Sequence, residues 1–502
     1  MTIRTTTRER RFQVIDGGRV PGAPAPVPLS LPEPPVMSAS ELAAEMAELY
    51  ALSLLRDVPF AAMADPHHVV RVDATTRFTL HELLCELRSL SWFDGGTFSA
   101  RGPVVLAAHG SRAADGEADH RRELRLNGDG QLTLRTLFRG VVSGGASDLR
   151  FSAFHASDCL TGEAPESCPR PATDAPLSSW VRYVERSAGA GLGRPGADDV
   201  SVLSWRTPRG LAEDMRASHP CRTFYSAALM LLARGSAFDP GLNGPAGGPP
   251  GVNGQTVLSS MAETAERAFD AAMRRHSRAG RLSRPAVFAA RFAAMAGLDD
   301  PAGGGNDTIL AALDELTRHA PNLMTWVARR NAAAKPPACS GESLLLPVMP
   351  GDDVMPHRAD CAAQGVIAGA MATLLKALFD TRRHARLRMV GVPGGGIDIG
   401  AEADRLAADI ALSRSVSGGW FQAENHQDLR LGEALAIQTI RLHFEAARTN
   451  LSLGFTDFDG RAVTVSAHPG ALGAGHASLR IDGRLAPWPL EQSRTAAHLA
   501  VV

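Results

Sequence analysis

The stretch HRADCAAQGVIAGAMATLLKALFD, residues 357–380, decides how this chain folds. Apolar residues in its second half recur at helical spacing on two adjacent stripes, so that most of the helix surface is apolar. A helix that is apolar on most sides is buried. We therefore expect a central helix over 364–380, in which Gly365 and Gly369 let neighbouring helices approach closely.

The rest of the sequence predicts a mainly α-helical protein with a small β tail. A first helix follows Ser40, a plausible N-cap, and residues 101–130 look like an exposed, Gly-rich, charged loop. Asp-Gly between alternating residues in GFTDFDGRAVTVS and HASLRIDGRLAPW predicts two hairpins. The further strong helical segments are 256–278, 306–333, 401–414 and 427–448.

Composition shifts along the chain divide it into four regions. These are an extended Pro-rich arm, an N-terminal helical region, a C-terminal helical bundle and a β-hairpin tail, expected at 1–37, 38–240, 241–450 and 451–502.

Composition also excludes several functions. The 502 residues carry a formal net charge of −1, whereas nucleic-acid binding requires a clear basic excess. The six cysteines form no CxxC pair, which argues against a thiolate metal site. Cys159 and Cys168 are near enough for a local disulfide, but we expect two reduced thiols. The longest apolar stretch is shorter than the roughly 20 residues of a membrane span, and the N-terminus lacks an apolar signal segment. We expect a cytoplasmic protein.

Two arginines indicate an anion site. Arg414 shares a helical stripe with Leu406 and Ile410, which carries its guanidinium into the core. A buried guanidinium requires an anionic partner, either an internal carboxylate such as Asp360 or a bound ligand. Arg284 precedes a proline and therefore lies outside a helix, in an extended conformation.

Several stretches together resemble the vanadium-dependent haloperoxidases over roughly residues 38–465, among them TPRGLAEDM, GVIAGAMATLLKALFD and LRLGEALAIQTIR. The resemblance implies the helical bundle of that family, which shares its oxyanion site with a superfamily of acid phosphatases. In the family, vanadate is held by a lysine and an arginine of a K-W…R-P motif, by a small-Gly-His motif, and by an arginine that precedes an axial histidine.

This chain keeps part of that site and has lost the rest. Arg284, His357 and Arg414 match the family pattern. The other positions differ: His276 replaces the lysine, Ala363 the glycine, Gln364 the acid/base histidine and Trp420 the axial histidine.

The losses have chemical consequences. An indole N–H is only a donor and cannot bind a metal, and an amide cannot exchange a proton near neutral pH as a histidine can. We therefore expect no metal and no cofactor. What remains is an anion site formed by Arg284, Arg414 and the N–H groups near Ala363, lined by His357, Trp420 and Phe421, with His276 and Gln364 as the candidate catalytic residues.

Three functions are compatible with this pattern. The first is a vanadium-independent enzyme that isomerises or rearranges an organic substrate, as some relatives in natural-product pathways do. The second is a non-catalytic binding or assembly module, and the third is a haloperoxidase with displaced ligands such as His426. As partners we expect a small anionic or aromatic molecule and a second copy of the chain in a homodimer, and neither nucleic acid nor a membrane.

Overall fold

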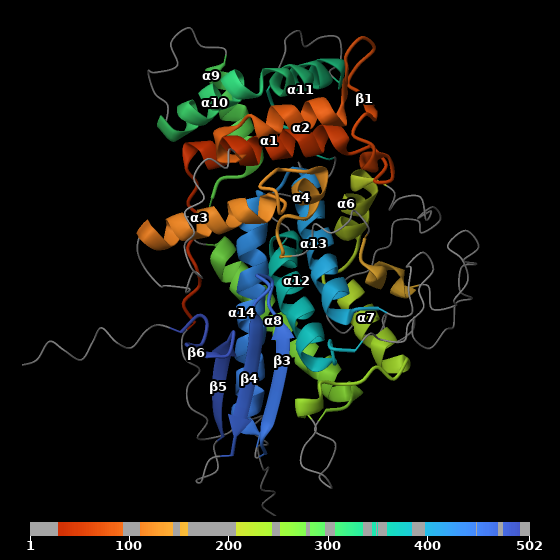
Figure 1. Cartoon of the computed structure of the whole chain (residues 1–502), viewed down its shortest axis with the longest axis vertical. Coiled ribbons are helices and arrows are strands. Elements are labelled where there is room, and N and C mark those ends of the chain that lie inside the picture. The colour runs from red at the N-terminus through yellow and green to blue at the C-terminus, as the bar shows by residue number, and fades with distance from the viewer. Residues whose placement is uncertain are drawn as a thin grey trace, which may run out of the picture. The chain divides into compact units, whose positions relative to one another are not determined.

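The computed structural model describes most of the chain (Figure 1). One compact unit spans Leu31–Leu490, and a second comprises Met1–Ser30 with Glu491–Val502. The residues described are 29–93, 111–143, 151–158, 207–242, 252–277, 282–296, 307–334, 344–347, 349, 359–383, 397–447, 449–469 and 475–491.

Helix α12 (Ala359–Leu378) is the centre of the bundle, as its apolar sequence predicts. Ile367, Met371 and Leu375 are all buried. A side chain at Gly369 would overlap with the backbone of Leu429, so glycine is required for this close approach. The neighbours of α12 in the bundle (Figure 1) are α8 (Gly254–His276), α13 (Ile399–Ser417) and α14 (Gln422–Ala446).

Shorter helices surround these four. They are α1 (Ala39–Leu55), α2 (Leu80–Arg88), α3 (Ser111–Arg125), α4 (Leu134–Arg139), α6 (Pro208–Ala217), α7 (Arg222–Ala233), α9 (Pro285–Met295), α10 (Asp307–His319) and α11 (Pro321–Ala334). Helices α10 and α11 replace the single helix predicted over 306–333, because Ala320 and Pro321 interrupt it. The first helix begins two residues earlier than predicted, since Ser38 and not Ser40 caps it by accepting from the N–H of Glu41.

Helix α3 corrects the prediction of a loop over 101–130. Two of its arginines, Arg121 and Arg125, are buried against α1. Arg121 Nε lies 2.7 Å from a carboxylate oxygen of Glu41, and Arg125 Nη2 lies 2.7 Å from one of Glu45. Charged residues that looked solvent-exposed are thus the contacts that dock the helix.

The β tail forms as predicted. Strands β3 (Leu451–Thr456), β4 (Ala462–His468), β5 (His476–Ile481) and β6 (Arg484–Ala486) make an antiparallel sheet in sequence order that packs on α14. Gly460 and Gly483 have positive φ in the two predicted Asp-Gly turns. A separate small hairpin pairs β1 (Val69–Arg71) with β2 (Arg77–Thr79).

Three further expectations concern membrane spans, the cysteines and a boundary between regions. Within the described residues, no helix combines the length and the apolar character that a membrane span requires. Cys85 and Cys221 are free thiols, whereas Cys159 and Cys168 lie outside the described residues, so their expected reduced state stays a prediction. The boundary expected near residue 240 also stays a prediction.

Candidate functional site

A cavity of about 460 Å³ opens where α8, α12 and α14 meet. Its wall includes the segment before α9, where Arg284 is extended (φ −66°, ψ 152°) as the following proline predicts. Gly418 ends α13 in the left-handed conformation and turns the chain toward Trp420. The lining residues are Pro34, Ala272, Arg275, His276, Leu282, Ser283, Arg284, Val287, Ala362, Val366, Gly419, Trp420, Glu424 and Asp428.

Behind this wall, Arg414 is buried as its helical stripe predicts. Its partner is an internal carboxylate, since Nη2 lies 2.7 Å from Asp428 Oδ2. Arg275 Nη1 lies 2.8 Å from Asp428 Oδ1, so one carboxylate joins two guanidiniums. The prediction named Asp360 as the internal candidate; its side chain lies outside the described part of the chain.

Gly365 makes this ion pair possible. A Cβ there would overlap with Arg414 Nη1 and would come 2.8 Å from Asp428 Cβ. The pair therefore occupies the space that a side chain on α12 would fill. This contact explains the glycine on the site side of the helix, as the Leu429 contact explains Gly369.

Trp420 faces two of the arginines. The guanidinium carbon of Arg414 lies 4.7 Å from the centre of its ring, and that of Arg284 lies 5.6 Å from it. Both distances are in the range of cation–π contact. The indole thus combines an apolar surface with cationic neighbours, a setting that suits a ligand with an aromatic part and a negative charge.

The cavity keeps an excess of positive charge. Arg275, Arg284 and Asp428 line the cavity, and Arg414 lies behind it. The carboxylate of Asp428 pairs with Arg275 and with Arg414. Nε and Nη1 of Arg414 are buried and have no hydrogen-bond partner among the described residues. Buried donors without an acceptor are costly, and an anion would supply acceptors.

Glu424 adds a group that titrates near neutral pH. Burial is the main cause that raises the pKa of Glu424 to about 7, and the N–H of Phe421, which donates to its carboxylate, lowers the pKa. The charge of Asp428 also raises this pKa, and the charges of Arg414 and Arg275 lower it. The carboxyl group lines the cavity beside Asp428, one helical turn away on α14. A group with this pKa can both accept and donate a proton at pH 7.

The predicted site residues do not all lie at the cavity. His276, Arg284 and Trp420 line the cavity, and Arg414 lies behind it. His357 lies outside the described residues.

Two residues predicted at the site are in the core instead. Ala363 and Phe421 are fully buried, and the Phe421 ring packs edge-on against Phe288 with 5.6 Å between centroids. Phe421 is also the N-cap of α14. It is not among the residues that line this cavity, and its predicted pocket-lining role stays a prediction.

Gln364 points elsewhere. Its amide Nε2 donates to the carbonyl of Met215 over 2.9 Å, and the residue borders a separate space of about 10 Å³ together with His219. A side chain held in this way helps to attach α6 to α12. Gln364 is therefore not among the residues that line the larger cavity, and its catalytic role stays a prediction.

Sequence reasoning missed Arg275, Glu424 and Asp428. Arg275 was one of several arginines at a helix end, where cations are usually solvated. Glu424 was missed because the predicted helix began at 427, whereas α14 begins at Gln422. With the correct start, the spacing of four residues between Glu424 and Asp428 would have placed both on one face.

No family model matches the chain. Its sequence is nevertheless similar to those of vanadium-dependent bromoperoxidases, and its fold is the helical-bundle fold of a solved vanadate-dependent bromoperoxidase.

The individual relatives are algal enzymes. The chain is 22% identical to a vanadium-dependent bromoperoxidase of Corallina pilulifera over 489 residues, which are 87% of the chain and 76% of the relative. It is 24% identical to one of Ascophyllum nodosum over 462 residues, 86% of the chain and 73% of the relative. A solved homohexameric vanadate-dependent bromoperoxidase of Ascophyllum nodosum matches with a TM-score of 0.55 at 16% identity, covering 93% of this chain and 76% of that one.

Proposed function

We propose that this protein is an acid–base enzyme that isomerises or rearranges a small anionic organic substrate without vanadate. The observation that carries the proposal is the cavity itself, where Glu424, with its pKa near 7, lies beside Asp428 and Arg275. A proton-transferring group next to cationic donors is the minimum requirement for this chemistry.

The residues present do not fit vanadate. The resemblance puts the axial ligand at Trp420, and an indole offers no lone pair to a metal. The ring also packs against the guanidinium of Arg414, at 4.7 Å from its carbon. The proposal therefore assigns no step to vanadate and no cofactor to the reaction.

Each group in the cavity has a role in the proposed reaction. Arg275 and Arg284 bind the anionic group of the substrate, and Trp420 contacts its apolar part. Glu424 removes a proton from one substrate carbon and returns it to another, so no oxidant or leaving group is needed. His276, which lines the same cavity, is the second group able to take part in this transfer.

The non-catalytic alternative rests on Asp428. This carboxylate already neutralises part of the charge of Arg275 and Arg414, as the internal partner of a closed site would. Under that alternative the cavity binds no anion. The third possibility, a displaced vanadium ligand at His426, has less support, because His426 lies with His120 and Asp459 and does not line the cavity.

For assembly, the homohexameric relative supports an oligomer. We propose that this chain also associates with copies of itself, with the homodimer as the smallest such form.

Titration with inorganic phosphate and then phenyl phosphate, followed by melting temperature, tests whether the cavity is open. Arg275→Gln should weaken binding about ten-fold, since it removes one charge-assisted contact. Arg274→Gln is the matched control, because Arg274 is the next residue on α8 and its side chain is 74% exposed. If neither anion raises the melting temperature, the cavity is closed and the non-catalytic alternative is correct.

A further inference from the structure

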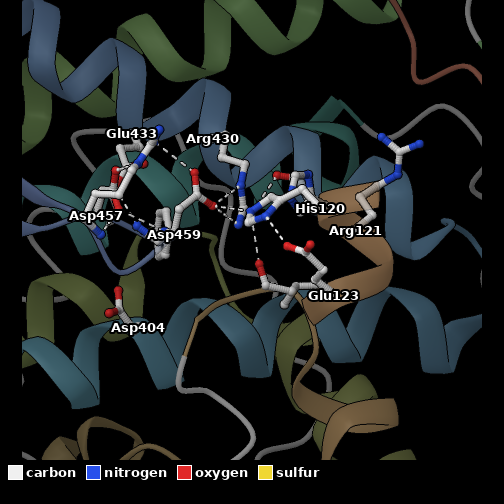
Figure 2. Close-up of polar contacts among 12 residues, drawn as sticks. His120, Arg121, Glu123, Asp404, Arg430, Glu433, Asp457 and Asp459 are labelled. Atoms are coloured by element: carbon white, nitrogen blue, oxygen red, sulfur yellow. Dashed lines mark hydrogen bonds and ion pairs between the residues drawn. The ribbon is translucent and has the colours of Figure 1, made fainter. Parts of the chain in front are cut away.

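Two histidines and an aspartate meet on a different face of α14. His120 is on α3, His426 on α14 and Asp459 in the turn between β3 and β4, and one possible ligand atom from each lies within 4.8 Å of the others. Figure 2 shows His120, Arg430 and Asp459 together, with Glu123 next to the His120 ring. His426 and Asp428 are two residues apart on one helix, so this cluster is separate from the cavity.

The geometry of the cluster suits a metal ion. His120 Nε2 lies 2.9 Å from Asp459 Oδ1. Two ligand atoms each about 2.1 Å from one ion lie about 3 Å apart at a right angle and about 3.4 Å apart in a tetrahedron. The ligand atom of His426 lies within 4.8 Å of the other two, and the centroid of its ring lies 5.6 Å from that of His120.

His426 supplies the second, independent observation. The residue is buried, with 6% of its surface exposed. Its Nε2 atom is inaccessible to solvent and has no hydrogen-bond partner among the residues that the structure describes. A buried polar atom without a partner is costly and requires an explanation, such as an absent ion.

We propose that His120, His426 and Asp459 bind a divalent transition-metal ion of the zinc class. Two imidazoles and one carboxylate are ligands that Zn²⁺ accepts, with a water molecule completing the coordination. In the metal-free arrangement, a hydrogen bond joins His120 Nε2 and Asp459 Oδ1. The ion takes the place of the bridging proton: a neutral ring moves that proton to Nδ1, and a protonated ring releases it to solvent.

Neighbouring residues support the ligands. When Nε2 binds the ion, the remaining proton of the His120 ring is at Nδ1, and Glu123 Oε2 lies 3.9 Å from that atom. A carboxylate behind a ligating histidine orients the ring and increases its basicity. On the other side, Arg461 Nη2 donates to Asp459 Oδ2 over 2.9 Å and fixes the carboxylate.

Arg430 limits the affinity. Its Nη2 donates to Asp459 Oδ1 over 2.5 Å, so a cation bound to the same oxygen experiences repulsion. Asp457, which pairs with Arg461 over 2.7 Å, offsets part of this positive charge. We therefore expect weaker binding than at a structural zinc site. Bound metal links α3, α14 and the β-sheet, and so stabilises the folded chain.

The experiment uses the full chain after treatment with a chelator and dialysis. Zn²⁺ is titrated by calorimetry and by melting temperature, and Co²⁺ replaces Zn²⁺ to give a visible absorption spectrum of the bound ion. The variants are His426→Gln and His120→Gln. The matched control is His319→Gln, which changes an exposed histidine at the end of α10.

The unmodified chain and the His319→Gln control should each bind one Zn²⁺ and melt at a higher temperature when it is bound. His426→Gln and His120→Gln should bind Zn²⁺ at least ten-fold more weakly and should not give the cobalt spectrum. The melting temperatures without metal show whether the variants are folded. Equal zinc affinity in the chain and in His426→Gln would overturn the proposal, as would the absence of binding in the unmodified chain.

Discussion

Arg414 Nη2 lies 2.7 Å from Asp428 Oδ2, and Asp428 lines the cavity while Arg414 is buried behind it. Asp428 also holds Arg275, at 2.8 Å. One carboxylate therefore pairs with two cations at the wall of the cavity, which a further arginine, Arg284, also lines.

Replacing Asp428 with asparagine should destabilise the protein and tighten anion binding. Breaking a buried ion pair costs about 3–5 kcal/mol, and it leaves Arg275 and Arg414 without a negative partner. Phosphate should then restore much of the lost stability. Denaturant unfolding with and without phosphate measures both effects, with Asp270→Asn on the exposed face of α8 as control. Weaker phosphate binding by Asp428→Asn would contradict this charge balance.

Gly365→Ala should be strongly destabilising for so small a change. The new methyl group overlaps with Arg414 and Asp428, neither of which can move into solvent. Gly128→Ala is the control, because a Cβ there meets nothing within 4 Å. We expect a loss of about 1–3 kcal/mol for the first variant, the range for overpacking in a core. Equal melting temperatures for the two variants would show that the ion pair is not packed as described.

Sulfate affinity should fall as the pH rises through about 7. Sulfate keeps its charge in this range, whereas Glu424 loses its proton near its raised pKa of about 7 and then repels the anion. Glu424→Gln should reduce the dependence on pH between 6 and 8. An unchanged profile in Glu424→Gln would exclude the carboxyl group from the site.

The stability of the whole protein should decrease from pH 5 to pH 8. Burial is the main cause that raises the pKa of Glu48 to about 8. The positive charge of Arg125 lowers this pKa, and the negative charge of Glu45 raises it. The folded state then keeps a proton that the unfolded chain loses near 4.5, so this stability is complete below that pH and disappears as pH rises through 8. Urea unfolding of Glu48→Gln should show a smaller decrease. The same slope in both proteins would mean that Glu48 ionises normally.

The core helices could be predicted from sequence because their apolar residues follow one period. The stripe through Ile367, Met371 and Leu375 determines both the helix and its burial, and Gly365 and Gly369 mark the close contacts. The hairpins were predictable for a similar local reason, since Asp-Gly favours the positive φ seen at Gly460.

Charged contacts between distant segments could not be predicted in this way. Arg121 and Arg125 look exposed in a loop-like composition, and their partners Glu41 and Glu45 are 80 residues away. The same applies to Asp428, which pairs with residues on two other helices. Such pairs depend on how helices meet, and helical spacing within one segment does not contain that information.

The central claim is that this cavity works without vanadate. The most direct measurement is the rate at which the purified chain brominates a phenolic dye with hydrogen peroxide and bromide, with and without added orthovanadate, next to an intact vanadium-dependent bromoperoxidase. We predict no vanadate-dependent turnover, because Trp420 cannot bind the metal. A vanadate-dependent rate comparable to that of the intact enzyme would contradict the account.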